Sequence, residues 1–382
     1  MEDRKIRVAI THGDTNGIGY ELIFKTFADP TILELCTPII YGSPKVAAYH
    51  RNVLGIQANF TIISKAEDAH EGRMNLLTTF DDEIKVEMGT PSDDSAAAAL
   101  KALKRVAEDA GKGLYDVLIT APMNNAKVNN QEFPFTSQTA FLEKKMGEGK
   151  KALTILVNEQ LRVALATTNI PVKEIASSIS KEMIIEKARV LFNTLKRDFL
   201  ITNPRIAILA LNPKCVEGTP TDKEEMEIII PAVEELENKG IQAFGPYPAD
   251  TFFGNGLFET FDGVLAMYHD QGLAPFKTID QGEGVCYTAG MPIIRTSAIC
   301  NNCFESAGKG IADECSFRHA IYLAIDAVRH RQQFDKAHES PLPKLYHEKR
   351  DESEKVRFAI PKAKSDKKPE QKGEEKKEEQ TG

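Results

Sequence analysis

The sequence of 382 residues lacks any long apolar segment, and this absence excludes several classes of protein. No run approaches the ~18 consecutive apolar residues that a membrane-spanning helix needs. The charged residues 1–5 are followed by an apolar segment that is too short for a signal peptide. We therefore expect a cytoplasmic protein that does not bind membranes.

An excess of positive charge is also missing. The chain has 48 Lys and Arg against 56 Asp and Glu, which gives a formal net charge of -8. No long basic face is evident in the sequence, so nucleic acid is not an expected partner. The binding partner is more simply expected to be a small molecule.

Cysteines are few and show no disulfide pattern. The six are scattered along the chain, and without a secretion signal they are expected to be reduced. Cys300 and Cys303 form a single C-x-x-C motif, whereas a zinc site of this type would need a second pair. Buried free thiols are the favoured interpretation, with metal binding or redox chemistry as the minor alternative.

Strand and helix patterns alternate along the rest of the chain. Strands are expected over residues 5–11, 115–120, 205–211 and 263–268 and on both sides of Gly290. Helices are expected over 95–111, from Val172, and from Ser180 as N-cap. A further helix has a capping box of Asp222 and Glu225 and is split by Pro231. The last helix has a core face of Phe317, Ile321, Ala324, Ile325 and Val328.

This alternation predicts an α/β fold of parallel strands covered by helices. Apolar runs at 152–157 and 162–168 surround Asn158-Glu159-Gln160 and predict a hairpin, hence a mixed sheet. Residues 362–382 contain seven Lys and six Asp or Glu with almost no apolar side chain. Such a segment cannot bury enough surface to offset the entropy of ordering, so we expect a disordered tail over 350–382.

The turn at residues 11–19, Thr-His-Gly-Asp-Thr-Asn-Gly-Ile-Gly, joins a strand to a helix. It matches neither the dinucleotide-binding G-x-G-x-x-G pattern nor a P-loop. Two interpretations remain open: backbone N–H groups at the helix start that bind an anion or substrate, or a tight turn that needs glycine for positive φ.

His269 and Asp270 follow directly after the apolar run 263–268, where open α/β sheets collect their ligands. With Asp250 they could bind a divalent metal ion or act as acid and base. Spacing alone favours a polar turn instead. Lys277, which is expected after a short loop, and Arg295 could hold a phosphate, although surface charge is the simpler interpretation of these two cations.

Several motifs occur together in one order and carry a family resemblance. They are Gly13-Asp14-x-x-Gly17-Ile18-Gly19, Thr120-Ala121-Pro122, Ala164-Leu165-Ala166-Thr167-Thr168, Leu211-Asn212-Pro213, Pro248-Ala249-Asp250-Thr251, Met267-Tyr268-His269-Asp270-Gln271-Gly272-Leu273, Ile294-Arg295-Thr296-Ser297 and Ala307-Gly308-Lys309-Gly310. From about residue 5 to 332 the chain resembles the 4-hydroxythreonine-4-phosphate dehydrogenase (PdxA) family of pyridoxal phosphate biosynthesis.

The resemblance implies a two-domain subunit like the isocitrate and isopropylmalate dehydrogenases, paired as a homodimer. Residues 1–130 with 265–335 would form one domain, and 131–264 the second, on the dimerisation side. The family oxidises a phosphorylated hydroxy-amino acid with NAD, and the product then loses CO2. A divalent metal ion (Zn, Mg, Mn or Co), held by three histidines, polarises the hydroxyl group.

Carried over to this sequence, the resemblance assigns His269 as a metal ligand and Thr139, Lys277 and Arg295 as substrate-binding residues. Asp250 and Asp270 are the expected catalytic carboxylates. The other two metal positions hold Asn169 and Lys214 instead of histidine.

Further positions of the family's site also differ. The Gly-His-Thr-Glu motif reads Ser137-Gln138-Thr139-Ala140, the expected lysine is Asn125, and the phosphate-side asparagine is Cys286. The Asp-His-Gly-Thr motif reads Ile299-Cys300-Asn301-Asn302, and the segment 215–219 departs from the family's cofactor loop. Two hypotheses follow: a dehydrogenase of this family, or a catalytically silent relative that binds a ligand or partner protein.

Overall fold

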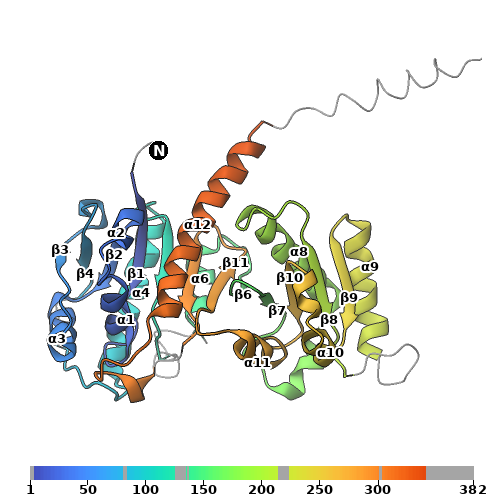
Figure 1. Cartoon of the computed structure of the whole chain (residues 1–382), viewed down its shortest axis with the longest axis horizontal. Helices are drawn as coiled ribbons and strands as arrows, with labels where there is room; N and C mark the ends of the chain where they lie inside the picture. The colour runs from blue at the N-terminus through green and yellow to red at the C-terminus, as the bar shows by residue number, and fades with distance from the viewer. Residues whose placement is uncertain are drawn as a thin grey trace, which may run out of the picture. The chain divides into compact units, whose positions relative to one another are not determined.

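The twelve strands that the structure describes form one mixed sheet (Figure 1). The computed structural model describes residues 4–80, 84–124, 135, 137–213, 223–300 and 303–340. In sheet order the strands are β3 (Phe60–Ile63), β4 (Met74–Thr78), β2 (Cys36–Gly42), β1 (Ile6–Thr11), β5 (Val117–Thr120), β12 (Ile294–Ala298), β11 (Val285–Ala289), β6 (Leu153–Val157), β7 (Arg162–Leu165), β10 (Gly263–Ala266), β8 (Arg205–Leu209) and β9 (Gln242–Tyr247).

The sheet consists of two parallel halves that run in opposite directions. All neighbours from β3 to β12 are parallel, and so are those from β7 to β9. Three antiparallel pairings, β12–β11, β11–β6 and β6–β7, join the halves. The predicted α/β class and mixed sheet are therefore confirmed. The expected division into two domains stays a prediction.

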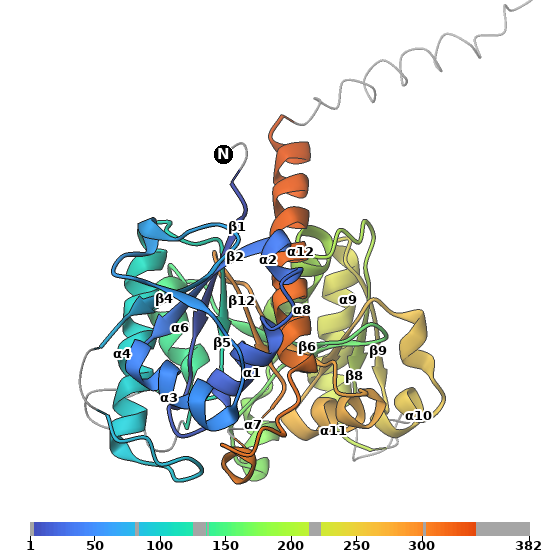
Figure 2. The same ribbon diagram turned by 60° about the vertical axis from the view of Figure 1, so that its left-hand side comes forward.

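Longer helices cover both faces of the sheet (Figures 1 and 2). The helices are α1 (Gly19–Thr26), α2 (Ile32–Leu35), α3 (Pro44–Leu54), α4 (Asp93–Ala110), α6 (Gln138–Met146), α7 (Ile175–Ser178), α8 (Lys181–Arg197), α9 (Ile230–Asn238), α10 (Ala249–Gly254), α11 (His269–Ile279) and α12 (Cys315–His338). Apolar residues of α1, α3, α8, α9 and α12 share one hydrophobic core. Helices α4 and α6 contribute to a second core, and α10 and α11 contribute to a third. Within the described ranges no helix is long and apolar enough to cross a membrane.

The hairpin and the helix starts follow the sequence prediction. Strands β6 and β7 pair antiparallel, and the Asn158 side chain accepts hydrogen bonds from the N–H groups of Gln160 and Leu161 to close the turn. Ser180 caps α8 by accepting from the N–H of Met183. A π-helical turn, Glu225–Ile229, precedes α9 and its Pro231, as expected for a split helix.

The Glu225 side chain has hydrogen-bond partners other than those of the predicted capping box. Asp222 lies outside the described residues, and the buried Glu225 carboxylate accepts from the N–H groups of Leu211 and Asn212 at 2.7 and 2.8 Å. The Asn212 side-chain amide also donates to it, at 2.8 Å. This carboxylate therefore fixes the chain directly after β8. The expected disordered tail over 350–382 also lies outside the described residues.

The turn after β1 is buried and requires glycine for steric reasons. Gly13 has φ +73°, and a Cβ there would lie 2.2 Å from the carbonyl oxygen of Pro122. A Cβ on Gly19 would lie 2.0 Å from the carbonyl oxygen of His12. Because residues 12–19 are buried, this structure supports the tight-turn interpretation over an anion site open to solvent.

Candidate active site

A cavity with a volume of about 670 Å³ lies next to the predicted site. It lies where α6, α8 and α11 meet the central strands β6, β11 and β12. Its lining includes Ser137, Thr139, Glu143, Thr154, Thr168, Asn169, Lys187, His269, Leu273, Lys277, Cys286, Ser297, Ile299 and Cys300. Residues from distant parts of the chain therefore converge here, as expected where an α/β sheet binds its ligand.

Helix α11 presents one face to this cavity. His269, Leu273 and Lys277 are spaced by four residues, which places them along one side of a helix, and all three line the cavity. The short loop expected before Lys277 is instead part of this helix, α11. The helix begins directly after β10 because Gln271 accepts from the N–H of Met267 and donates to the carbonyl of Ala210. Its start is thus fixed to the ends of β10 and β8.

His269 and Asp270 are in direct contact. The Nδ1 atom of His269 lies 2.7 Å from Oδ1 of Asp270, and both side chains are open to solvent. His269 also lines an adjoining cavity of about 200 Å³ together with Asn169 and Asp270. Asn169 has φ +53°, in the left-handed region that asparagine tolerates better than most residues. Two of the family's three metal positions, 169 and 269, therefore meet at the same place.

Two further cations lie at the cavity. Burial lowers the pKa of Lys187, whose Nζ lies 3.4 Å from the carbonyl oxygen of Ala152. Arg295 is 5% exposed and does not line the cavity itself. Its guanidinium donates to the hydroxyl groups of Thr120, Thr288 and Thr139, the last at 3.4 Å. Among the described residues no carboxylate pairs with Arg295.

Thr139 connects this buried cation to the cavity. It stands in the first turn of α6, whose N-cap Ser137 accepts from the N–H of Ala140 at 3.2 Å. The neighbouring Gln138 is buried instead and donates to the carbonyl of Ala121 at 3.3 Å. The predicted substrate residues Thr139 and Lys277 thus line the cavity, and Arg295 lies behind Thr139.

The thiol of Cys300 lies at the cavity and is protonated at neutral pH. Burial raises the pKa of Cys300 to about 12, with Cys303 adding to the shift and Lys277 opposing it. A thiol binds soft metal ions as its thiolate, and an ion bound at Cys300 would also meet the positive charge of Lys277, so this environment does not favour Cys300 as a metal ligand. Cys300 and Cys303 are both free thiols, but both are half-buried rather than buried as the sequence predicted.

Other predicted residues lie apart from the cavity or outside the described chain. Asp250 is exposed in the first turn of α10 and does not line either cavity, so its catalytic role stays a prediction. Lys214, Asn125 and Asn301 belong to segments outside the described residues. The structure gives no place to these three.

Sequence reasoning missed Lys187 and Glu143. Lys187 lies on α8 and Glu143 on α6, and only the packing of these helices brings both to the cavity. Glu143 is already engaged, because it accepts from Lys151 Nζ at 3.1 Å and from the N–H of Ala152 at 2.9 Å. No motif in the sequence marks either residue. The one available signal was the position of each residue in its helix, counted from the N-caps Ser180 and Ser137.

The sequence matches the family described as "Pyridoxal phosphate biosynthetic protein PdxA" over residues 34–324. The chain belongs to this family. It is 53% identical over 358 residues to a 4-hydroxythreonine-4-phosphate dehydrogenase of Bacteroides thetaiotaomicron, covering 94% of this chain and 98% of that protein. An enzyme of the same name from Aquifex aeolicus is 38% identical over 322 residues, with 84% and 98% covered.

Solved structures of PdxA-family proteins agree with this fold. A 4-hydroxythreonine-4-phosphate dehydrogenase from Klebsiella pneumoniae superimposes with a TM-score of 0.74 at 27% identity, covering 86% of this chain and 99% of that one. The corresponding protein from Burkholderia phymatum gives 0.69 at 30% identity, with 85% and 99% covered. The family expectation from the sequence motifs is thereby confirmed.

The described residues do not fit a three-histidine metal centre. His269 is the one imidazole among the described lining residues, and Asn169 offers an amide in place of a second. The third family position is Lys214, whose charge would repel a metal ion. Mg²⁺ or Zn²⁺ at this place would therefore lack most of the nitrogen ligands that the family uses.

Proposed function

We propose that this chain is an NAD-dependent dehydrogenase of pyridoxal phosphate biosynthesis that oxidises 4-hydroxythreonine-4-phosphate or a closely similar phosphorylated hydroxy-amino acid. The observation that carries the proposal is the convergence of His269, Lys277 and Lys187 on one cavity, with Arg295 buried behind it. Relatives that cover nearly the whole chain bear this enzyme's name. The substrate is anionic, and the cavity supplies cations.

The cations are assigned to the anionic groups of the substrate. Lys277 and Lys187 line the cavity, and the charge of Arg295 acts through its hydrogen bond to Thr139. A phosphate carries up to two negative charges and accepts several hydrogen bonds, so it matches this group of donors. The buried position of Arg295 strengthens its field, because the protein interior screens a charge less than water does.

His269 is assigned as the general base. Asp270 accepts the Nδ1 proton, which leaves Nε2 free to take the proton of the substrate hydroxyl group. As the O–H bond breaks, its electron pair forms the carbonyl, and the hydrogen on the same carbon leaves as hydride. NAD, when bound, supplies the hydride acceptor. No residue is assigned to NAD, because the segment expected to form part of its loop, 215–219, lies outside the described residues.

The oxidised product is a β-keto acid, which loses CO2 when its carboxylate is not held in place. Cations beside the new carbonyl stabilise the enolate that forms as the carbon–carbon bond breaks. Lys187 and Lys277 are the described residues able to do so. We also propose, from the family resemblance, a homodimer with this cavity near the subunit interface.

The test is NADH formation by the purified full chain with 4-hydroxythreonine-4-phosphate, with and without EDTA. We expect turnover that EDTA does not abolish. His269→Gln should lower kcat by about 10²–10⁴-fold, the usual contribution of a general base. Asp270→Asn should lower it less, because the imidazole remains. His70→Gln, at a histidine away from the cavity, is the matched control.

Two outcomes would contradict different parts of this proposal. Turnover that needs added Zn, Mg, Mn or Co, and that rises in Asn169→His, would contradict the metal-free base mechanism while keeping the activity. No NADH under any of these conditions, combined with tight binding of the phosphorylated compound, would favour the silent, ligand-binding relative instead. Light scattering of the same sample tests the proposed dimer.

A further inference from the structure

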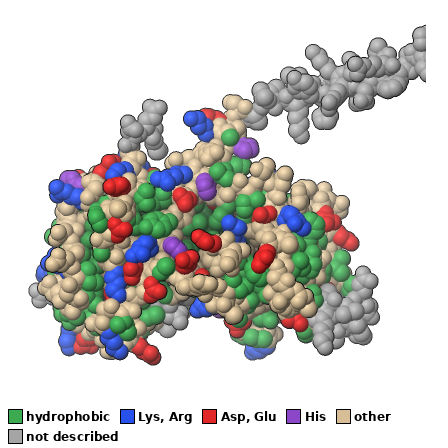
Figure 3. Space-filling view, in the orientation of Figure 1, with side chains coloured by type: hydrophobic (Ala, Val, Ile, Leu, Met, Phe, Trp, Pro, Cys, Tyr) green, Lys and Arg blue, Asp and Glu red, His purple; other side chains and the backbone are tan. Residues whose placement is uncertain are grey.

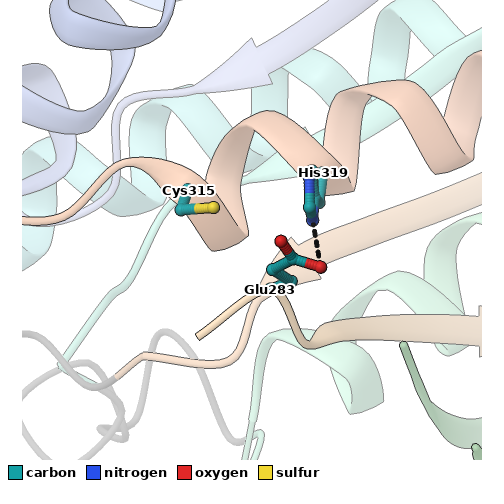
Figure 4. Close-up of side chains that lie close together, drawn as sticks. All are labelled: Glu283, Cys315 and His319. Carbon is teal, nitrogen blue, oxygen red and sulfur yellow. Dashed lines mark ion pairs between the residues drawn. The ribbon is translucent and has the colours of Figure 1, made fainter. Parts of the chain in front are cut away.

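A second group of side chains with metal-binding chemistry lies outside the cavity (Figure 4). Cys315 begins helix α12, His319 stands one turn later, and Glu283 lies in the connection between α11 and β11. Their ligand atoms all lie within 4.8 Å of one another. Among the described residues this is the one group of three or more such side chains that is gathered in this way.

The spacing of these atoms suits ligands of a shared ion. His319 Nδ1 lies 3.8 Å from the nearer Glu283 oxygen, which is longer than a hydrogen bond. Around a tetrahedral zinc ion with bonds of about 2.0–2.3 Å, two ligand atoms lie roughly 3.3–3.6 Å apart. The residues Cys315 and His319 are four apart in sequence, so one helix face presents both. Movement of these side chains towards one ion would complete a three-ligand set.

The surroundings attract a cation. All three side chains are half-buried, and the Asp313 carboxylate accepts from the N–H of Cys315 at 2.9 Å. Burial raises the pKa of the Cys315 thiol, and Asp313 and Glu283 raise it further. The same negative charge that disfavours a thiolate would stabilise a divalent ion, which displaces the thiol proton on binding.

We propose that Glu283, Cys315 and His319 bind a divalent transition metal ion of the zinc type. One sulfur, one imidazole nitrogen and one carboxylate oxygen select zinc over the hard ions Mg²⁺ and Ca²⁺. The half-exposed position leaves room for water as the fourth ligand. This site is separate from the family's metal position at His269, and the inference does not depend on the proposed dehydrogenase activity.

The ion would tie the α11–β11 connection to the start of α12. This junction already carries the Ser316 hydroxyl, which donates to the carbonyl of Gly284 at 2.6 Å and accepts from the N–H of Ile299 at 3.0 Å. Helix α11 carries Lys277, and Ile299 lines the active-site cavity. A metal ion here therefore acts as a structural clamp that holds cavity-lining elements in register.

The experiment uses the full chain, freed of metal by dialysis and titrated with Zn²⁺ against a colorimetric chelator. We expect one Zn²⁺ per chain. Cys315→Ser, His319→Asn and Glu283→Gln should each weaken the affinity, by at least about 100-fold for the first two, since losing even an outer-shell partner costs 10–100-fold. Titration with Co²⁺ should give the thiolate-to-cobalt absorption band of the unmodified protein, and Cys315→Ser should abolish that band.

Cys303→Ser and His70→Asn are the matched controls, and both should bind Zn²⁺ and Co²⁺ like the unmodified protein. Loss of the cobalt band in Cys303→Ser but not in Cys315→Ser would assign the metal to the C-x-x-C pair and overturn the proposal. Absence of stoichiometric Zn²⁺ binding by the unmodified protein would overturn it as well. This result does not depend on whether any variant folds.

Discussion

The Arg295 guanidinium donates a hydrogen bond to the Thr139 hydroxyl, 3.4 Å away, and so connects a buried cation to a side chain that lines the cavity. Its other described partners are also hydroxyl groups, of Thr120 and Thr288. Burial lowers the pKa of Arg295, because the charged form loses water without gaining a carboxylate. A buried charge held by neutral groups costs stability, which points to a functional reason for it.

Arg295→Met should therefore weaken substrate binding without a matching loss of stability. We expect KM for the phosphorylated substrate to rise about 10–100-fold, as for a lost charged hydrogen bond of ~1.5–3 kcal/mol. The free energy of unfolding should stay within about 1–2 kcal/mol, because removal of the buried charge offsets the lost hydrogen bonds. Steady-state kinetics and urea unfolding measure the two quantities. Arg331→Met, at an arginine that is 13% exposed and paired with the buried Asp198, should show the opposite pattern.

Lys187→Gln should raise KM and remove the rise in KM that is expected on the alkaline side. Burial lowers the pKa of Lys187, so its charge is lost at a lower pH than that of an exposed lysine. Substrate binding by the unmodified protein should accordingly weaken on the alkaline side before ordinary lysines titrate. In Lys187→Gln this alkaline rise in KM should vanish. Lys173→Gln, at an exposed lysine, should leave the KM profile unchanged; an identical profile in both variants would contradict the assignment.

The framework of the fold could be predicted because its signals are local. Asn158 closes the hairpin with its own side chain, and Ser180 caps α8 three residues before its partner Met183. Binary patterning and caps extend over a few residues, so one sequence suffices to recognise them. The buried turn at Gly13 belongs to the same class, although its contact with Pro122 could not be foreseen.

The site could be predicted only where a motif marks it. His269 and Lys277 stand in one recognisable segment, and both line the cavity. Lys187 carries no motif and reaches the cavity through the packing of α8, so spacing gave no indication of it. Glu283 and His319 are 36 positions apart, as their numbers show. Only the course of the chain from β11 to α12 brings them together.

Acid should destabilise the protein through two buried histidines. Burial lowers the pKa of His12 to about 3 and that of His50 to about 4, with His50 also lowering that of His12. Below pH 6.5 the unfolded chain takes up protons that the folded chain excludes. The free energy of unfolding should keep its full contribution from the two histidines above pH 6.5. It should then fall towards pH 4 by about 1.4 kcal/mol per pH unit for each histidine.

Urea unfolding at pH 7 and pH 5 measures this loss. His50→Gln is the informative variant, because glutamine keeps a donor for the Thr15 carbonyl that His50 contacts at 2.7 Å but does not titrate. The decrease between the two pH values should be about half as large in this variant. A decrease equal to that of the unmodified protein would show that His50 does not contribute, and His70→Gln serves as the control.

Two arginine–aspartate pairs join α8 and its C-terminal end to α12, and they should differ in their effect on stability. Asp198 is 3% exposed and accepts from Arg331 at 2.8 Å through each oxygen, and from the Tyr287 hydroxyl at 2.7 Å. Asp198→Asn should cost about 3–5 kcal/mol, because it leaves the buried guanidinium without its counter-charge. Arg197 and Asp335 make an equally short pair near solvent, so Asp335→Asn should cost less than about 1 kcal/mol. Urea unfolding at neutral pH compares them, and equal losses would show that burial does not set the strength of these pairs.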